Sequence, residues 1–260
     1  MFILRTILTG VLLALIGPMP AAAQSLGSLE ISGRVKIDGR VEKLSRKRFY
    51  LLKGGLKDNQ ELVTRLRGAE IKSRDCFYTQ MQASPQYICW LQAENCESPF
   101  CRVVTTDDIG RVPEFQAAYK KGLTQFKGLE TVARDWITTN MPPVLASGYY
   151  LDRRKLNLSL FGGIKPIQSS MTDSVSVKAI FIDIPVTLGA GKKTGTFLIS
   201  NILPIEFGAK SYLWACEVEI GTDKPTAFSL KLPENNKPVK NCEVFVRDLQ
   251  VCKTESCTQK

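Results

Sequence analysis

The first regular pattern in the chain is an alternation of apolar and polar residues that begins at Leu29. Such alternation is typical of a half-buried β-strand, here predicted over 29–38. Asp38-Gly39 supplies the positive-φ chemistry of a hairpin turn, and a second strand is predicted over 48–52. The apolar face of the first strand carries Leu29, Ile31, Val35 and Ile37.

After residue 55 the apolar period changes to that of a helix. Residues from Leu62 onward recur at three- and four-residue spacing, which predicts amphipathic helices through the segment 56–165. Starts and stops of these helices are indicated by Ser84-Pro85, Pro113, Met141-Pro142-Pro143 and Gly162-Gly163.

From residue 175 the alternation of strands returns and continues to residue 246. Ile180, Ile182 and Ile184 alternate with Ala179 and Phe181, so this strand is apolar on both faces, as expected of a central strand. A later strand has one apolar face made of Tyr212, Trp214, Cys216, Val218 and Ile220. The chain therefore predicts an α+β fold of two strands, a helical block and five strands.

Composition and charge limit the classes of protein and of catalysis that are compatible with the chain. The 260 residues are 44% hydrophobic and 23% charged, with a formal net charge of +10, as in an ordinary globular protein. The chain contains no histidine, which excludes catalysis by Ser-His-Asp or Cys-His arrangements.

The amino terminus has the pattern of a secretory signal peptide over residues 1–23. Arg5 precedes an apolar run, and Ala21-Ala22-Ala23 precedes Gln24. The run is shorter than the ~20 residues that cross a bilayer, and no later stretch approaches that length, so no transmembrane segment is predicted. We expect a mature chain that begins at Gln24 and is periplasmic or secreted.

Export favours disulfides over free thiols. The eight cysteines are Cys76, Cys89, Cys96, Cys101, Cys216, Cys242, Cys252 and Cys257. Cys216 and Cys242 both fall on apolar strand faces and are predicted to pair in the core. Locality favours the remaining pairs within 76–101 and within 216–257, while other connectivities stay open. A zinc site formed by Cys96, Cys101, Cys252 and Cys257 is an alternative at the edge of zinc spacing.

Basic residues crowd the stretch 34–57, which contains few acids. Within it, Arg46, Lys47 and Arg48 are the candidate anion-binding residues, and the expected partners are anionic lipids or polysaccharides of the cell envelope. Nucleic acid is not expected outside the cytoplasm, and no aromatic-interleaved platform is present. The simpler alternative is a soluble basic surface.

Three parts of the chain resemble carboxypeptidase regulatory-like domains, which are transthyretin-like antiparallel β-sandwiches. The matching residues are Gly33-Arg34-Val35, Asp38-Gly39, Phe49-Tyr50-Leu51 and the run 195–204 that leads toward Tyr212. The family places Pro-Gly directly before that tyrosine, whereas 205–211 intervene here. The resemblance implies a sandwich domain formed by 24–55 and 166–260 and split by a helical insertion, 56–165; a separate five-stranded C-terminal domain is the alternative.

The resemblance also implies a non-catalytic module. We therefore expect an exported, disulfide-stabilised binding or structural protein of the bacterial cell envelope or secretome, with a protein or an anionic envelope polymer as partner and no cofactor. The alternative is a secreted hydrolase that uses carboxylates, for which Asp107-Asp108 and Glu217/Glu219 are the candidate pairs. A third possibility is an inhibitor of secreted hydrolases, with the loop 96–101 exposed between cysteines.

Overall fold

The structure is a computed structural model that describes residues 25–93, 96–187, 193–234, 237–249, 252 and 257. The predicted signal peptide, residues 1–23, lies outside the described residues. In the part of the chain that is described, no helix combines the length and the apolar character needed to span a membrane.

Two packed sheets and a separate two-stranded hairpin form the β-part of the described chain. The smaller has the order β10-β1-β6, with β10 Thr226–Ser229, β1 Ser25–Ser32 and β6 Lys178–Val186. The larger has the order β11-β9-β7-β4-β5, with β11 Cys242–Asp248, β9 Lys210–Gly221, β7 Thr194–Ser200, β4 Arg48–Lys53 and β5 Gln168–Met171, and short β8, Ile205–Phe207, also pairs with β9. The β1–β10 pair is parallel and the pairs of the larger sheet are antiparallel.

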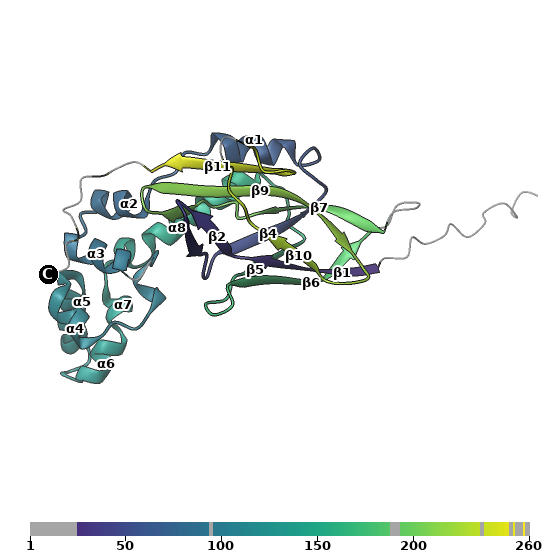
Figure 1. Cartoon of the computed structure of the whole chain (residues 1–260). Helices are drawn as coiled ribbons and strands as arrows, with labels where there is room; N and C mark the ends of the chain where they lie inside the picture. The colour runs from purple at the N-terminus through teal and green to yellow at the C-terminus, as the bar shows by residue number, and fades with distance from the viewer. Residues whose placement is uncertain are drawn as a thin grey trace, which may run out of the picture.

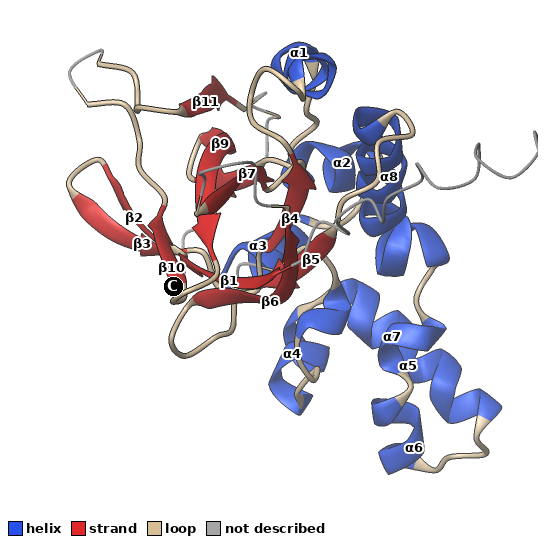
Figure 2. Cartoon of the chain, turned by 90° about the vertical axis from the view of Figure 1, so that its right-hand side faces the viewer, coloured by secondary structure: helices blue, strands red, loops and turns tan. Residues whose placement is uncertain are grey.

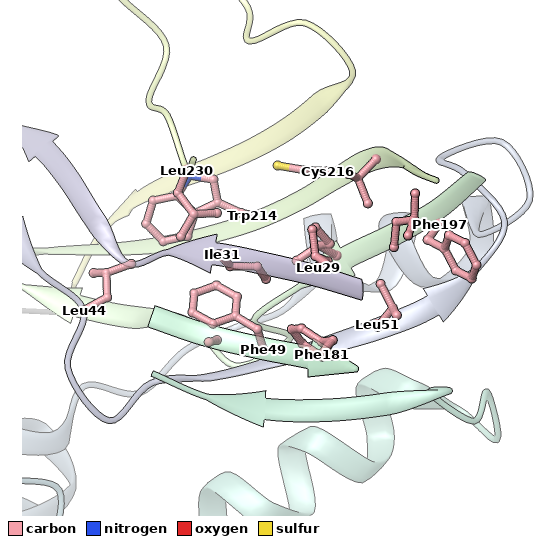
Figure 3. Close-up of a cluster of buried hydrophobic side chains, with 14 of the residues drawn as sticks. Leu29, Ile31, Leu44, Phe49, Leu51, Phe181, Phe197, Trp214, Cys216 and Leu230 are labelled. Atoms are coloured by element: carbon pink, nitrogen blue, oxygen red, sulfur yellow. The ribbon is translucent and has the colours of Figure 1, made fainter. Parts of the chain in front are cut away.

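The sandwich core lies between these sheets and contains residues from both ends of the chain (Figure 3). Leu29 and Ile31 from β1 and Phe49 from β4 pack with Trp214 and Cys216 from β9. The apolar face predicted for 212–220 is thus the core-facing side of β9.

The helices form two groups, as Figures 1 and 2 show. Leu62 and Leu66 of α1 and Leu160 of α8 pack against Leu198 and Leu213 on the outer face of the larger sheet. The other helices surround an aromatic-rich cluster that includes Tyr78, Tyr87, Phe115 and Tyr149. The helices are α1 Gln60–Gly68, α2 Arg74–Gln80, α3 Pro85–Ala93, the 3-10 turn η1 Pro99–Cys101, α4 Thr106–Arg111, α5 Pro113–Gln125, α6 Glu130–Asp135, α7 Ile137–Asn140 and α8 Pro143–Phe161.

The starts of α3 and α5 and the end of α8 lie where serine, proline and glycine residues predicted them. The Ser84 hydroxyl accepts a hydrogen bond from the Tyr87 amide at 3.1 Å, so Ser84 acts as the predicted N-cap of α3. Helix α5 begins at Pro113, and α8 ends at Gly162, whose φ of 53° closes the helix in the left-handed region.

The strand predicted over 29–38 is broken at Gly33, and its partner is not 48–52. Gly33 donates to the carbonyl of Val177 at 2.8 Å, and a Cβ there would lie 3.0 Å from that oxygen, so any other residue would force its neighbours to shift. Beyond the bend, β2 (Arg34–Ile37) pairs with β3 (Arg40–Lys43) around Asp38-Gly39. The hairpin turn is therefore present, but β1 and β4 belong to different sheets.

The central position predicted for the isoleucine-rich strand is wrong. Strand β6 ends the smaller sheet, and Ile180 and Ile182 are 57% and 60% exposed, so the outer face of β6 is open to solvent. The Ile180 amide donates to Ser170 Oγ at 3.1 Å, and Gln168 Nε2 donates to the Ile182 carbonyl at 2.6 Å. Side chains of β5 thus cover the free edge of β6 and close one corner between the sheets.

All eight cysteines form disulfides, and Cys216 pairs with Cys242 as predicted. Cys96–Cys101 also follows the expected locality. The locality rule is wrong for the other two, because Cys76 pairs with Cys252 and Cys89 with Cys257, which ties the end of the chain to α2 and α3. The zinc alternative fails for the same reason, since its four cysteines belong to three separate disulfides.

The helical segment does not simply stand beside the sandwich. Helix α1 packs on the larger sheet, and the sheet contains strands from both ends of the chain. The C-terminal part supplies seven strands rather than five. The α+β class is confirmed, whereas independent folding of 24–55 with 166–260 stays a prediction.

A fragment of residues 170–260 is expected to aggregate, because Leu29, Ile31 and Phe49 fill the core between the sheets. Analytical ultracentrifugation of the fragment, alone and with a 24–55 peptide, measures this. A monomeric fragment that unfolds cooperatively by itself would contradict the shared core.

Reduction of the long-range disulfides is expected to cost more stability than reduction of the short one. On the chain-entropy model, loss of Cys76–Cys252 alone costs about 3 kcal/mol, because Cys89–Cys257 still closes almost the same loop and the missing bond closes a ring of only about 18 residues. Loss of Cys96–Cys101, with a separation of 5, costs about 2 kcal/mol. Urea unfolding of the double variants C76S/C252S and C96S/C101S tests this order. Non-reducing peptide mapping checks the pairing itself.

Candidate anion-binding pocket

A cavity of about 260 Å³ lies between the start of β4 and helix α8. It joins segments that are more than a hundred residues apart in sequence and includes the three candidate anion-binding residues. The lining residues are Arg46, Lys47, Arg48, Tyr50, Glu97, Tyr150, Arg153, Arg154, Asn157, Met171, Asn201, Leu203 and Ile205.

The backbone at the start of β4 is held by Thr172, which follows β5. The amide of Lys47 donates to Thr172 Oγ1 at 2.9 Å, and the amide of Arg46 donates to the Thr172 carbonyl at 3.0 Å. The guanidinium of Arg46 donates to the carbonyl of Cys101, and that of Arg48 donates to Ser169 Oγ. Both guanidinium groups are exposed and keep further donors available at the cavity.

Arg153 enters the cavity from the buried side of α8. Its side chain is only 8% exposed, and Nη2 donates to the carbonyl of Pro204 at 2.7 Å. Nε and Nη1 make no hydrogen bond to any described residue. Burial favours the neutral form of Arg153, but Tyr149, Glu97 and Glu206 outweigh this effect and hold its pKa above the ordinary value. The cavity is therefore bordered by a charged guanidinium whose Nε and Nη1 are buried.

Glu97 is the one carboxylate among the described lining residues. Its Oε1 lies 3.6 Å from Lys47 Nζ and 4.0 Å from Arg153 Nη2. It belongs to the loop closed by the Cys96–Cys101 disulfide, and its carbonyl accepts from the Tyr78 hydroxyl at 3.0 Å. Five cations and one acid line the cavity, so its formal charge is 5 − 1 = +4.

Tyr149 contacts the Arg153 guanidinium and is itself held by a hydrogen bond to Glu206. The Tyr149 hydroxyl donates to Glu206 Oε1 at 2.8 Å, and the Arg153 guanidinium lies over the Tyr149 ring at 5.7 Å from its centroid. Burial, together with Glu206 and Glu97, raises the pKa of Tyr149 well above its ordinary value. Tyr149 is therefore a neutral phenol that orients the guanidinium through its ring face.

Asn201 shapes the opposite wall. Its Nδ2 donates to the carbonyls of Leu203 and Tyr212, and its Oδ1 accepts from the amide of Trp214 at 2.8 Å. These bonds hold Ile202 at a φ of 53°, an unfavourable value for a β-branched residue. The loop 201–205 thus depends on one buried amide.

Sequence reasoning missed Arg153, Arg154 and Glu97. Arg153 follows Tyr149 by four residues and precedes Leu156 by three, so it falls on the apolar face that was predicted to be buried. A charged residue at a core position is the signal that could have found it. Glu97 carried no such signal, because the 96–101 disulfide loop and the fold bring it to the cavity.

The carboxylate pairs have other roles in the structure. Asp108 is the N3 residue of a capping box with Thr105 and binds Arg102 through both carboxylate oxygens. Burial alone would raise the pKa of Asp108, but the bonds from Arg102 and Thr105 lower it below the ordinary range. Glu217 accepts from the Leu56 amide, and Glu219 accepts from Thr194 and Thr196. Neither pair lines the cavity.

Within the described residues, no cluster of cysteine and acidic side chains could hold a metal ion. In comparisons with protein-family models, curated proteins and solved structures, nothing matches this chain. The resemblance to carboxypeptidase regulatory-like domains therefore rests on its short motifs alone.

Replacement of Asn201 by alanine is expected to destabilise the protein by about 2–4 kcal/mol, because the Trp214 amide and two carbonyls lose a buried partner. Chemical denaturation measures the effect. Asn157→Ala is the control, since the half-buried Asn157 amide makes one hydrogen bond, to the Tyr50 hydroxyl. Equal losses for the two variants would contradict the role given to Asn201.

Proposed function

We propose that this protein is an exported, disulfide-stabilised binding module of the bacterial cell envelope or secretome, and that its pocket holds an anionic group. The observation that carries the proposal is the buried guanidinium of Arg153. It lies beside Arg46, Lys47 and Arg48 and has two nitrogens without a hydrogen-bond partner among the described residues. A phosphate, sulfate or carboxylate group in the cavity would balance this charge and accept hydrogen bonds from the exposed guanidinium groups of Arg46 and Arg48.

The charge arrangement supports this proposal. A cavity of formal charge +4 with partly buried walls attracts anions more strongly than scattered surface lysines do. Glu97 is the internal competitor, and it is 47% exposed at the rim. An incoming anion can therefore displace it into solvent.

A binding role has more support than the hydrolase alternative. Glycoside hydrolysis by carboxylates requires two acids across a cleft, one of which protonates the leaving group. The pocket brings one carboxylate to the described lining, and Asp108, Glu217 and Glu219 serve as acceptors for structural donors elsewhere. Cationic side chains stabilise bound anions without any group that transfers a proton.

The proposal includes export from the cytoplasm and a transthyretin-like sandwich fold. Four disulfides in a chain of this size are typical of oxidising compartments. Two sheets that enclose one core, with Gly33 and the Asp38-Gly39 turn at the positions of the resemblance, are compatible with a regulatory-like sandwich. In such a module the sandwich acts as a support and the inserted helices complete the binding surface.

Titration calorimetry with pyrophosphate, at low and high ionic strength, tests the pocket. We expect binding that weakens steeply with salt, since screening acts over ~10 Å at 0.1 M. Arg153→Met should abolish it and lower the unfolding temperature only modestly, because methionine fills the buried volume but leaves the Pro204 carbonyl without its donor. Unaltered affinity in Arg153→Met would contradict the proposal.

The double variant R46Q/R48Q is expected to bind pyrophosphate about tenfold more weakly, which corresponds to roughly 0.7 kcal/mol for each lost charge. R34Q/K43Q is the matched control. It removes the same charge from the exposed β2–β3 pair, outside the lining of the pocket. Equal losses in both variants would show general surface attraction and not a site.

Glu97→Gln is expected to tighten pyrophosphate binding several-fold, because it removes the acid that competes for Lys47 and Arg153. Competition calorimetry at constant ionic strength measures the change. Glu114→Gln controls for the altered net charge, since Glu114 bonds to Ser84 away from the pocket. Weaker binding in Glu97→Gln would contradict the role of Glu97 as a competitor.

A further inference from the structure

Helix α8 has a second apolar stripe on the side that faces solvent. Val144, Leu151 and Leu158 repeat every seven residues and are 42%, 47% and 64% exposed. At 1.5 Å per residue the stripe is about 21 Å long. The opposite side of α8 already buries Leu145, Tyr149 and Leu160 in the helical and sheet clusters, so the stripe is not needed for the fold.

The stripe lies directly beside the pocket. On the helical wheel Arg154 is about 60° from Leu151, and Tyr150 is about 100° from it in the same direction. Arg154 and Tyr150 line the pocket and are themselves exposed. Across the mouth, Met171 of β5 is also exposed and lines the cavity. Apolar side chains therefore flank a cationic cavity on two sides.

The charges next to the stripe indicate which kind of partner surface can bind it. Beside the stripe, α8 exposes two cations, Arg154 and Lys155, and a single acid, Asp152. A symmetric dimer formed through the stripe would gather the cations of both copies in one interface, which disfavours a second copy as occupant. An anionic lipid surface instead complements both features, since it offers acyl chains to the leucines and negative headgroups to the cations.

We propose that α8 docks this protein on an anionic membrane surface, with Val144, Leu151 and Leu158 in the interfacial layer and a lipid phosphate in the pocket. The inference rests on the proposed function, because the headgroup is the anion that the pocket holds. Tyr150 lies at the boundary, where an aromatic ring with a polar end is most favourable. The protein lies on the membrane in this arrangement and binds it reversibly.

Co-sedimentation of the whole protein with vesicles tests the docking. Vesicles of equal parts phosphatidylglycerol and phosphatidylcholine should bind it, and vesicles of phosphatidylcholine alone should not. L151S/L158S is expected to weaken vesicle binding more than tenfold while its affinity for glycerol phosphate in solution is unchanged. V41S/V103S is the control, because Val41 and Val103 are exposed apolar residues outside α8, and their replacement should leave binding intact.

The outcomes separate the two proposals. Glycerol phosphate binding without vesicle binding, or vesicle binding that L151S/L158S leaves unchanged, overturns the membrane proposal and leaves the anion pocket standing. A dimer in ultracentrifugation that L151S/L158S converts to a monomer assigns the stripe to a second copy and also overturns it. Loss of both phosphate and vesicle binding in wild-type protein overturns the pocket as well.

Discussion

The larger sheet is buried on both faces, and this constraint determines where the helices and the pocket lie. Strand β9 directs Trp214 and Cys216 into the sandwich and Leu213 and Ala215 to the other side. A sheet with two apolar faces needs cover on each. The smaller sheet covers one face, and α1 with the end of α8 covers the other. Because α8 is held there, its middle turns meet the start of β4, and the cavity forms where they meet.

Features that depend on residues close in sequence could be predicted from the sequence, and features that depend on distant residues could not. Elements set by local chemistry, such as the Ser84 cap, the Pro113 start and the Asp38-Gly39 turn, are where the sequence predicted them. The pairing of strands depends on distant segments and was harder to predict. Gly33 bends the chain toward Val177, and β6 is an edge strand despite its apolar composition. Neither the bend nor the uncovered face of Ile180 can be read from periodicity, because both depend on which element packs nearby.

The same distinction applies to the site. The basic composition of the stretch indicates Arg46, Lys47 and Arg48, but the cavity that they line is completed by Arg153 from a helix about a hundred residues later. Disulfides show the contrast most clearly. Cys216 and Cys242 both fall on apolar strand faces, which predicts their pairing from sequence. The β9–β11 register confirms it, because the two residues lie directly opposite each other. Cys252 and Cys257 follow the last strand, where no pattern indicates which helix the chain meets.

Five cations around one cavity destabilise the folded state through mutual repulsion, whereas Glu97, Glu206 and the Pro204 carbonyl offset the cost of burying Arg153. A hydrophobic residue at position 153 would remove one of the five charges but would leave the Pro204 carbonyl without its donor. The Cys96–Cys101 loop lowers the cost by holding Glu97 at the rim, and the Cys76–Cys252 disulfide restricts the unfolded chain over most of its length. The covalent ties thus offset the mutual repulsion of the lining cations, which is the energetic arrangement that the proposed anion binding requires.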